Sequence, residues 1–123
     1  MKNLLWIGLA GAFGALARYG LSGLVQRRAG EGFPWGTLAV NLAGCFVFGL
    51  VWAVAENRLR LSGVRTIVLI GFVGAFTTFS TFAFETGALL DSSKWPLAAG
   101  NIFMHCAGGL LLLFAGMALG ARI

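Results

Sequence analysis

The sequence predicts an all-α membrane protein with four transmembrane helices. Of its 123 residues, 59% are hydrophobic and only 11% are charged, and the mean hydropathy is +0.88. Soluble domains carry about a quarter charged residues, so a chain this small has too little polar surface to cover a core in water. Long stretches of the chain also lack any charged residue. Each of these is long enough to cross about 30 Å of hydrocarbon as a helix of about 20 residues.

The first expected helix contains Arg18, which must either snorkel to the interface or face protein. The other three expected helices are based on stretches without charge, which run between Glu31 and Glu56, between Arg65 and Glu85, and between Lys94 and Arg122. Polar connectors separate the helices and leave no residues for a soluble domain. The chain 1–123 is therefore expected to form a single transmembrane domain, with helices over about residues 4–25, 33–55, 66–89 and 95–121.

The tryptophans support this layout, because each lies near an expected helix end, where an interfacial aromatic belt forms. They are Trp6, Trp35, Trp52 and Trp95. A cleaved signal peptide is the alternative for the first apolar run, since Lys2 precedes it and residues 15–17 read Ala-Leu-Ala, the form of a cleavage site. The glycines within the run favour a packed helix instead, because small residues let helices approach closely in lipid.

The charge distribution bears on assembly. An even number of helices places both termini on one side, together with Lys2, Arg58, Arg60, Arg65 and Arg122. The other side carries Arg18, Arg27, Arg28 and Lys94. The positive-inside rule needs a clear excess on one side, so insertion in both orientations and an antiparallel, dual-topology homodimer are expected. The alternative is a fixed orientation set by the basic cluster Arg58, Arg60 and Arg65.

Several function classes are disfavoured by composition. Four acidic residues and one histidine leave little for acid–base or metal chemistry, so we do not expect an enzyme. The net charge of +5 does not predict nucleic-acid binding, because the nine Lys and Arg residues are dispersed over chain ends and connectors. Cys45 and Cys106 lie within apolar runs and indicate no disulfide framework.

The third expected helix carries unusual polarity. The segment Gly71–Glu85 reads GFVGAFTTFSTFAFE, and its hydroxyl residues follow Gly74 at mid-membrane depth: Thr77, Thr78, Ser80 and Thr81. We expect this helix to be broken there, with the freed carbonyls bound by protein, water or a cation. The alternative is a continuous helix whose hydroxyls bond to carbonyls of the preceding turn.

Other side chains are candidates for an ion pathway. Phe79 and Phe82 share a helix face, and their positive ring edges would attract a small anion, although core packing is the alternative. Asn41, with Thr37 one turn earlier, offers amide donors to an anion or to a neighbouring helix. Glu85 is the one acid well inside an apolar context.

Three segments in this order closely resemble the Fluc-type fluoride channels, also called the CrcB family. They are GALARY (Gly14–Tyr19), GTLAVNLAG (Gly36–Gly44) and GFVGAFTTFSTFAFE (Gly71–Glu85). The resemblance implies an antiparallel, dual-topology homodimer in the cell membrane, a multi-pass protein of the bacterial inner membrane. It also implies passive fluoride export through two pores, each using both subunits, which relieves fluoride toxicity.

The resemblance assigns roles to individual residues. Phe79 and Phe82 would be the aromatic pair that meets fluoride, and Asn41 would line the anion path. Gly74 and Thr77 would offer backbone carbonyls to a central, structural sodium ion. Arg18 would make a vestibule electropositive. The polar track along the pore would comprise or adjoin Thr37, Ser80, Thr81 and Glu85. The fourth helix departs from the family pattern. Some family members carry Tyr and Ser near the positions of Asn101, His105 and Gly109, whereas Gly109 offers no hydroxyl.

Two other functions remain open. A proton-coupled small multidrug exporter is also a four-helix, dual-topology dimer, but it needs a membrane-embedded acid in the first helix, which has none here. A non-transporting assembly subunit would use its glycine-rich faces only to hold partner helices.

Overall fold

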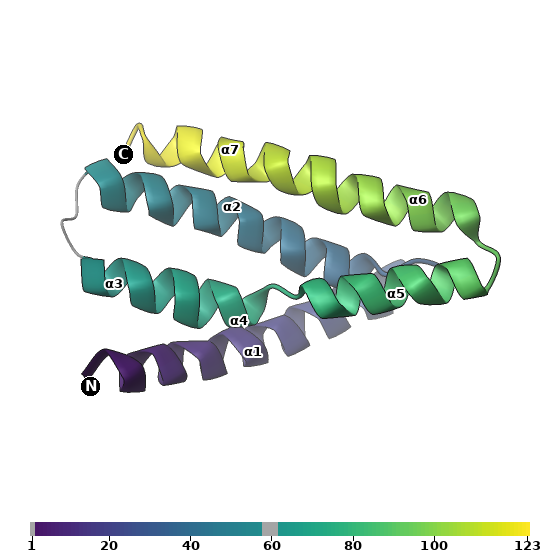
Figure 1. Ribbon diagram of the computed structural model, residues 1–123, viewed down its shortest axis with the longest axis horizontal. Helices are drawn as coiled ribbons and strands as arrows, with labels where there is room; N and C mark the ends of the chain where they lie inside the picture. Colours follow the sequence, from purple (N-terminus) through teal and green to yellow (C-terminus); the bar gives the residue numbers. More distant parts are fainter. Residues whose placement is uncertain (1, 58–61) are drawn as a thin grey trace.

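The computed structural model describes residues 2–57 and 62–123, and in these residues it contains helices and no strand. Figure 1 shows the helices lying lengthwise beside one another, with both termini at the same end. Four spans are long and apolar enough to cross a membrane, Asn3–Ala29, Trp35–Glu56, Gly63–Asp91 and Trp95–Gly120. The predicted all-α membrane fold with four transmembrane helices is confirmed. Arg58 and Arg60, which entered the charge comparison, lie outside the described residues.

The first two spans are single helices, α1 (Lys2–Ala29) and α2 (Trp35–Asn57). Helix α1 continues through the polar residues that follow the apolar run and ends before Gly30, whose φ of +94° is readily available only to glycine. The Gln26 side chain holds the turn: its Nε2 donates to the carbonyls of Gly30 and Phe33, and its Oε1 accepts from the Gly36 N–H. This local network fixes where α2 begins.

The third and fourth spans are segmented. The third contains α3 (Ser62–Thr66), the π-helical segment η1 (Ile67–Val73), α4 (Gly74–Phe76) and α5 (Phe79–Asp91). The fourth contains α6 (Trp95–Phe103), the π-helical segment η2 (Met104–Gly108) and α7 (Gly109–Gly120). Short π-helical segments inside α-helices occur often at functional sites, so η1 and η2 are candidate site elements.

Glycines set the tightest contacts between helices. A Cβ atom added at Gly116 of α7 would collide with the Phe46 carbonyl oxygen of α2, and one added at Gly49 of α2 would collide with the Leu113 carbonyl oxygen of α7. A Cβ atom added at Gly14 of α1 would likewise collide with the Phe72 carbonyl oxygen of η1. Helix association in lipid depends on close backbone packing, so these glycines hold α2 to α7 and α1 to the third span.

The third span is broken at Thr77 and Thr78, as the sequence predicts. Both residues are extended, with φ and ψ of −80° and 158° for Thr77 and of −149° and 112° for Thr78. The Thr77 hydroxyl does donate to the carbonyl of Val73 in the preceding turn, at 3.1 Å. The helix nevertheless stops after Phe76 and restarts at Phe79, so the expected break is confirmed and the alternative of a continuous helix is wrong.

Candidate functional site

The break is held open by the side chain of Asn41, which comes from the second turn of α2. The Asn41 Oδ1 accepts from the Thr78 N–H at 2.8 Å, and the Asn41 Nδ2 donates to the Thr78 carbonyl at 3.0 Å. In a continuous α-helix the Thr78 N–H would instead donate to the Gly74 carbonyl. The Asn41 amide therefore replaces the helical acceptor of the Thr78 N–H and adds a donor to the Thr78 carbonyl, in an apolar setting where unsatisfied backbone groups are costly.

Hydroxyl groups cap the helix that restarts after the break. The Thr78 Oγ1 accepts from the Thr81 N–H at 3.3 Å, which is the usual N-cap bond of a threonine at a helix start. The same oxygen lies 2.9 Å from the Thr81 Oγ1 and 3.4 Å from the Ser80 Oγ. Ser80 and Thr81 are exposed on the outside of the chain. A row of hydroxyls thus lies at the N-terminus of α5.

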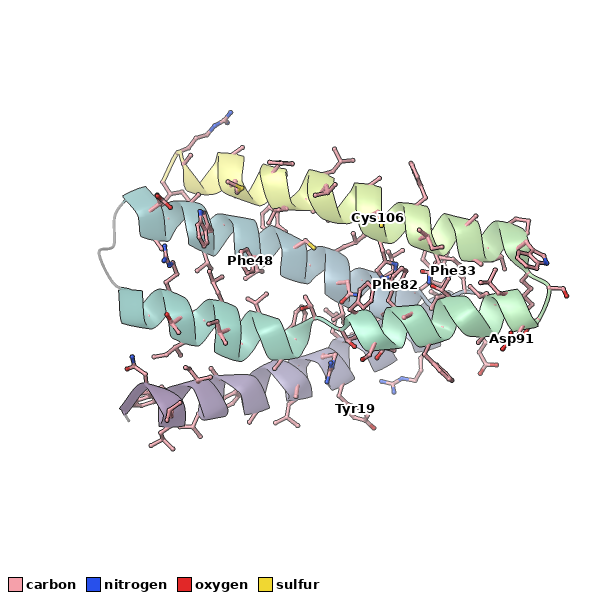
Figure 2. All side chains as sticks on the ribbon, viewed as in Figure 1. Tyr19, Phe33, Phe48, Phe82, Asp91 and Cys106 are labelled. Atoms are coloured by element: carbon pink, nitrogen blue, oxygen red, sulfur yellow. The ribbon has the colours of Figure 1, made fainter. Side chains whose placement is uncertain are left out.

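A cavity of about 330 Å³ lies beside the break and is lined by both predicted aromatic residues. The rings of Phe79 and Phe82 are tilted by 59° with centroids 5.5 Å apart, and Phe79 is 79% exposed while Phe82 is 9% exposed. Figure 2 labels three residues from different helices that line this cavity, Phe82, Phe48 and Cys106. Asn41, Thr77 and Thr78 line it as well. The structure thus brings the aromatic pair and the Asn41 amide to one space.

Helix α5 is tied to the fourth span by a buried chain of hydrogen bonds. The Thr86 hydroxyl donates to the Phe82 carbonyl at 2.7 Å, and the Asn101 Nδ2 donates to the Thr86 Oγ1 at 2.9 Å. Asn101 is 0% exposed. His105 approaches the same chain, with its Nδ1 2.9 Å from the Asn101 carbonyl oxygen and its ring centroid 4.3 Å from that of Phe82. These contacts position Phe82 from the side away from the break.

Thr86 was missed by the sequence analysis. It lies one helical turn after Phe82, so the helical spacing was available as a signal, but no sequence pattern links it to Asn101.

Glu85 and Thr37 form a separate polar pair. The Thr37 hydroxyl donates to the Glu85 Oε1 at 2.7 Å, and Thr37 is 4% exposed. The Glu85 Oε2 is buried and has no hydrogen-bond partner among the described residues. Glu85 lines a cavity of about 380 Å³ near the turns that join α1 to α2 and α5 to α6, together with Lys94 and Gln26. Glu85 therefore belongs to this outer cavity and not to the one beside Phe79 and Phe82.

Arg18 lies beside the break, in a cavity different from the one that Phe79 and Phe82 line. Its Nη1 donates to the Thr77 carbonyl at a long 3.5 Å, and it lines a cavity of about 430 Å³ with Thr37, Thr78 and Thr81. Thr78 lines this cavity and the one beside Phe82. The broken segment thus separates a space with a cationic side chain from a space with aromatic rings.

The carbonyls of Gly74 and Thr77 have the donor type that a hard cation prefers. The Thr78 N–H, which a helix would direct at the Gly74 carbonyl, goes to Asn41. The Thr81 N–H, which a helix would direct at the Thr77 carbonyl, goes to the Thr78 hydroxyl. Both carbonyls are therefore released from their helical donors, and Gly74 is exposed, so the residues fit an oxygen-ligated cation.

Gly109 is buried against Cys45, where a Cβ would lie 3.4 Å from the sulfur.

Comparison with known proteins agrees with this geometry. The family model described as "CrcB-like protein, Camphor Resistance (CrcB)" matches residues 5–117. A protein of Nitrosococcus oceani named fluoride-specific ion channel FluC is 56% identical over 116 residues, covering 94% of this chain and 93% of that protein. Proteins of the same name are 52% identical in Solidesulfovibrio magneticus, over 100% of this chain and 99% of that one, and 54% identical in Nitratidesulfovibrio vulgaris (strain Miyazaki F), over the whole of both.

These relatives are named as channels, which agrees with the expectation that the chain is not an enzyme. Together with the four apolar spans, they make the chain a multi-pass membrane protein of the bacterial inner membrane. The match covers the first helix, the Asn41 segment and the broken third span together. The chain therefore belongs to the CrcB family.

Proposed function

We propose that this chain is a fluoride-selective channel, through which fluoride leaves the cytoplasm passively and fluoride toxicity is relieved. The observation that carries the proposal is the helix break, where Asn41, the two threonines of the break, Thr77 and Thr78, and the rings of Phe79 and Phe82 line one cavity. The names of the relatives support fluoride as the ion.

The groups at the break suit a small anion that holds its water strongly. The Asn41 Nδ2 has a second N–H besides the one that it donates to Thr78, and the hydroxyls of Ser80 and Thr81 are exposed at the same level. Phe79 and Phe82 add ring edges with partial positive charge. Such donors replace part of the hydration shell without a full positive charge, so fluoride is admitted without being trapped. We place Thr37 and Glu85 at the outer end of this polar track.

A second copy of the chain completes the pathway in this proposal. Gly74, Phe79, Ser80 and Thr81 are exposed on the single chain at mid-membrane depth. Lipid cannot satisfy hydroxyls or a broken backbone, so protein or water must cover this face. The near balance of basic residues between the two sides permits both orientations in the membrane. An antiparallel homodimer would therefore cover both broken segments and form two pores, each with residues from both subunits.

We further propose a structural sodium ion at the centre of this dimer, held by the Gly74 and Thr77 carbonyls of both copies. The ion would neutralise carbonyl dipoles that face one another across the two-fold axis. Arg18, beside the Thr77 carbonyl, would raise the positive potential of the adjoining vestibule and attract anions from water.

Fluoride efflux from liposomes tests the proposal. Purified protein is reconstituted in liposomes loaded with both fluoride and chloride, and valinomycin with potassium balances the charge. Fast fluoride release with chloride retained is expected. The substitutions Phe79→Ile, Phe82→Ile and Asn41→Asp should abolish release while the purified dimer keeps its size. Phe114→Ile is the matched control, since Phe114 is exposed on α7 and lines none of the cavities described above.

Normal fluoride release in all three variants would refute the pore assignment and favour the assembly-subunit function. Release of chloride at a rate similar to that of fluoride would refute the selectivity.

A further inference from the structure

Arg65 and Trp52 form a cation–π pair at the end of the molecule that carries both termini. The Arg65 guanidinium lies over the Trp52 ring, with its Cζ 4.7 Å from the ring centroid. Phe48, one turn before Trp52 on α2, stacks with that ring, with centroids 6.2 Å apart and planes inclined by only 9°. Figure 1 shows the end of α2 and the start of α3, which carry the pair, at the same end as the termini. Two stacked rings therefore form a platform for the guanidinium.

The guanidinium has donors to spare. Stacking on a ring face leaves the five N–H groups of an arginine available to an acceptor. Among the described residues, Arg65 forms no hydrogen bond and no ion pair. Glu56, which lies one turn after Trp52, is the one acid at this end, and residues 58–61 read Arg-Leu-Arg-Leu and add none. Arg65 is half-buried, where an unpaired cation is costly, so its anionic partner should come from outside the chain.

The pair lies at the level of lipid headgroups. Arg65 is only two residues beyond the start of the apolar span Gly63–Asp91, which is about 3 Å along a helix axis. The headgroup layer is roughly 5–7 Å deep on each side of the hydrocarbon, and tryptophan is enriched at that level. Trp52 is 38% exposed, and Val64, next to Arg65, is 49% exposed. An exposed apolar surface thus adjoins the free donors of Arg65.

We propose that Arg65 and Trp52 form a binding site for the phosphate group of an anionic phospholipid. The planar fork of the guanidinium matches two phosphate oxygens, and the exposed surfaces of Trp52 and Val64 adjoin the acyl chains. A free phosphate ion presents the same oxygens, but the position of the site within the headgroup layer favours the lipid. The site is independent of the proposed channel function, because Arg65 and Trp52 line none of the three cavities described above.

Lipid binding to the purified full-length protein in neutral detergent tests the site, with native mass spectrometry counting the bound lipids. We expect one dioleoylphosphatidylglycerol per chain, bound about tenfold more tightly than zwitterionic dioleoylphosphatidylcholine, the effect of a hydrogen bond to a charged group. Inorganic phosphate at the same concentration should not displace the lipid.

Two substitutions that keep the net charge separate this site from general attraction to an anionic surface. Arg65→Lys removes the planar fork, and Trp52→Leu removes the platform, so each should weaken binding of phosphatidylglycerol about tenfold. General attraction depends on charge and predicts no loss in either variant. Arg122→Gln is the matched control, since it removes an exposed cation from the same end and should keep most of the preference. Arg65→Lys decides the matter if Trp52→Leu does not fold.

Three results would overturn the inference. Equal affinity of the wild type for both lipids would show that no anionic headgroup binds, as expected if a second copy of the chain covers this end. Wild-type affinity in Arg65→Lys would assign the preference to surface charge alone. Displacement of the lipid by inorganic phosphate at equal concentration would assign the site to a free phosphate ion. None of these results bears on fluoride release, so the channel function stands or falls separately.

Discussion

Replacing Asn41 by leucine tests whether one side chain holds the third span open. Leucine has a similar size but neither accepts from the Thr78 N–H nor donates to the Thr78 carbonyl, so bonds of 2.8 and 3.0 Å are lost. A buried backbone group left unsatisfied costs about 1–3 kcal/mol, and hydrogen bonds measured within membranes lie at or below the low end of that range. The loss of the two bonds should therefore cost about 2 kcal/mol of unfolding free energy.

Thermal unfolding of the purified protein in detergent measures this loss. About 2 kcal/mol should lower Tm by roughly 8 °C for a chain of this size. Cys45→Ala is a control on the same helix and cavity, where no hydrogen bond is removed, and it should lower Tm by less than half as much. Asn41→Asp keeps the acceptor but places a second carboxylate oxygen beside the Thr78 carbonyl. Acidification should partly restore its Tm, because a protonated carboxyl donates as the amide does.

The reasoning fails if Asn41→Leu unfolds within about 2 °C of the wild type, since two lost bonds of ordinary strength would then have no effect. It also fails if Asn41→Asp is no more stable in acid than at neutral pH. A variant that stays stable by re-forming the helix across residues 77 and 78 would show a gain in helical circular dichroism. Such a gain would show that Asn41 selects the broken form instead of stabilising the fold.

Three further predictions concern packing, the outer polar pair and the proposed cation. Gly116→Ala should destabilise the protein by about 1–3 kcal/mol, because the added Cβ meets the α2 backbone. Gly8→Ala should be neutral or stabilising, because a Cβ added there has no neighbouring atom within 4 Å. Equal Tm values for the two variants would contradict this. Thr37→Val should lower both Tm and fluoride efflux, because the hydroxyl that bonds to Glu85 is lost, and Thr37→Ser should restore both. Full fluoride efflux in the valine variant would exclude Thr37 from the proposed pathway. Replacing sodium by N-methylglucamine should lower the unfolding free energy of the dimer by about 2.7 kcal/mol, if the sodium concentration had been about 100 times the dissociation constant. An unchanged Tm would refute a structural sodium ion.

Two polar contacts, one at each end of its first turns, hold α5 in place although the third span is broken. Asn41 holds its start through Thr78, and Asn101 holds its first turns through Thr86 and the Phe82 carbonyl. Phe82 lies between these anchors and is buried, while Phe79 is exposed toward the face that we assign to a second copy. The aromatic pair thus combines one ring fixed within the chain with one ring available to an interface.

The four spans, the place of the break and the family could all be predicted from the amino-acid sequence. These features depend on local composition: the transfer of uncharged segments into lipid decides the spans, and the cluster of hydroxyl residues after Gly74 weakens the helix at Thr77 and Thr78. The side chains that bond to the backbone at the break could not be predicted in this way, because they come from other helices. Asn41 and Thr78 are 37 residues apart, and Asn101 and Thr86 are 15 apart on different spans. Such pairs depend on how each helix is rotated about its axis, and the π-helical segment that carries His105 changes that rotation in a way that helical periodicity does not predict.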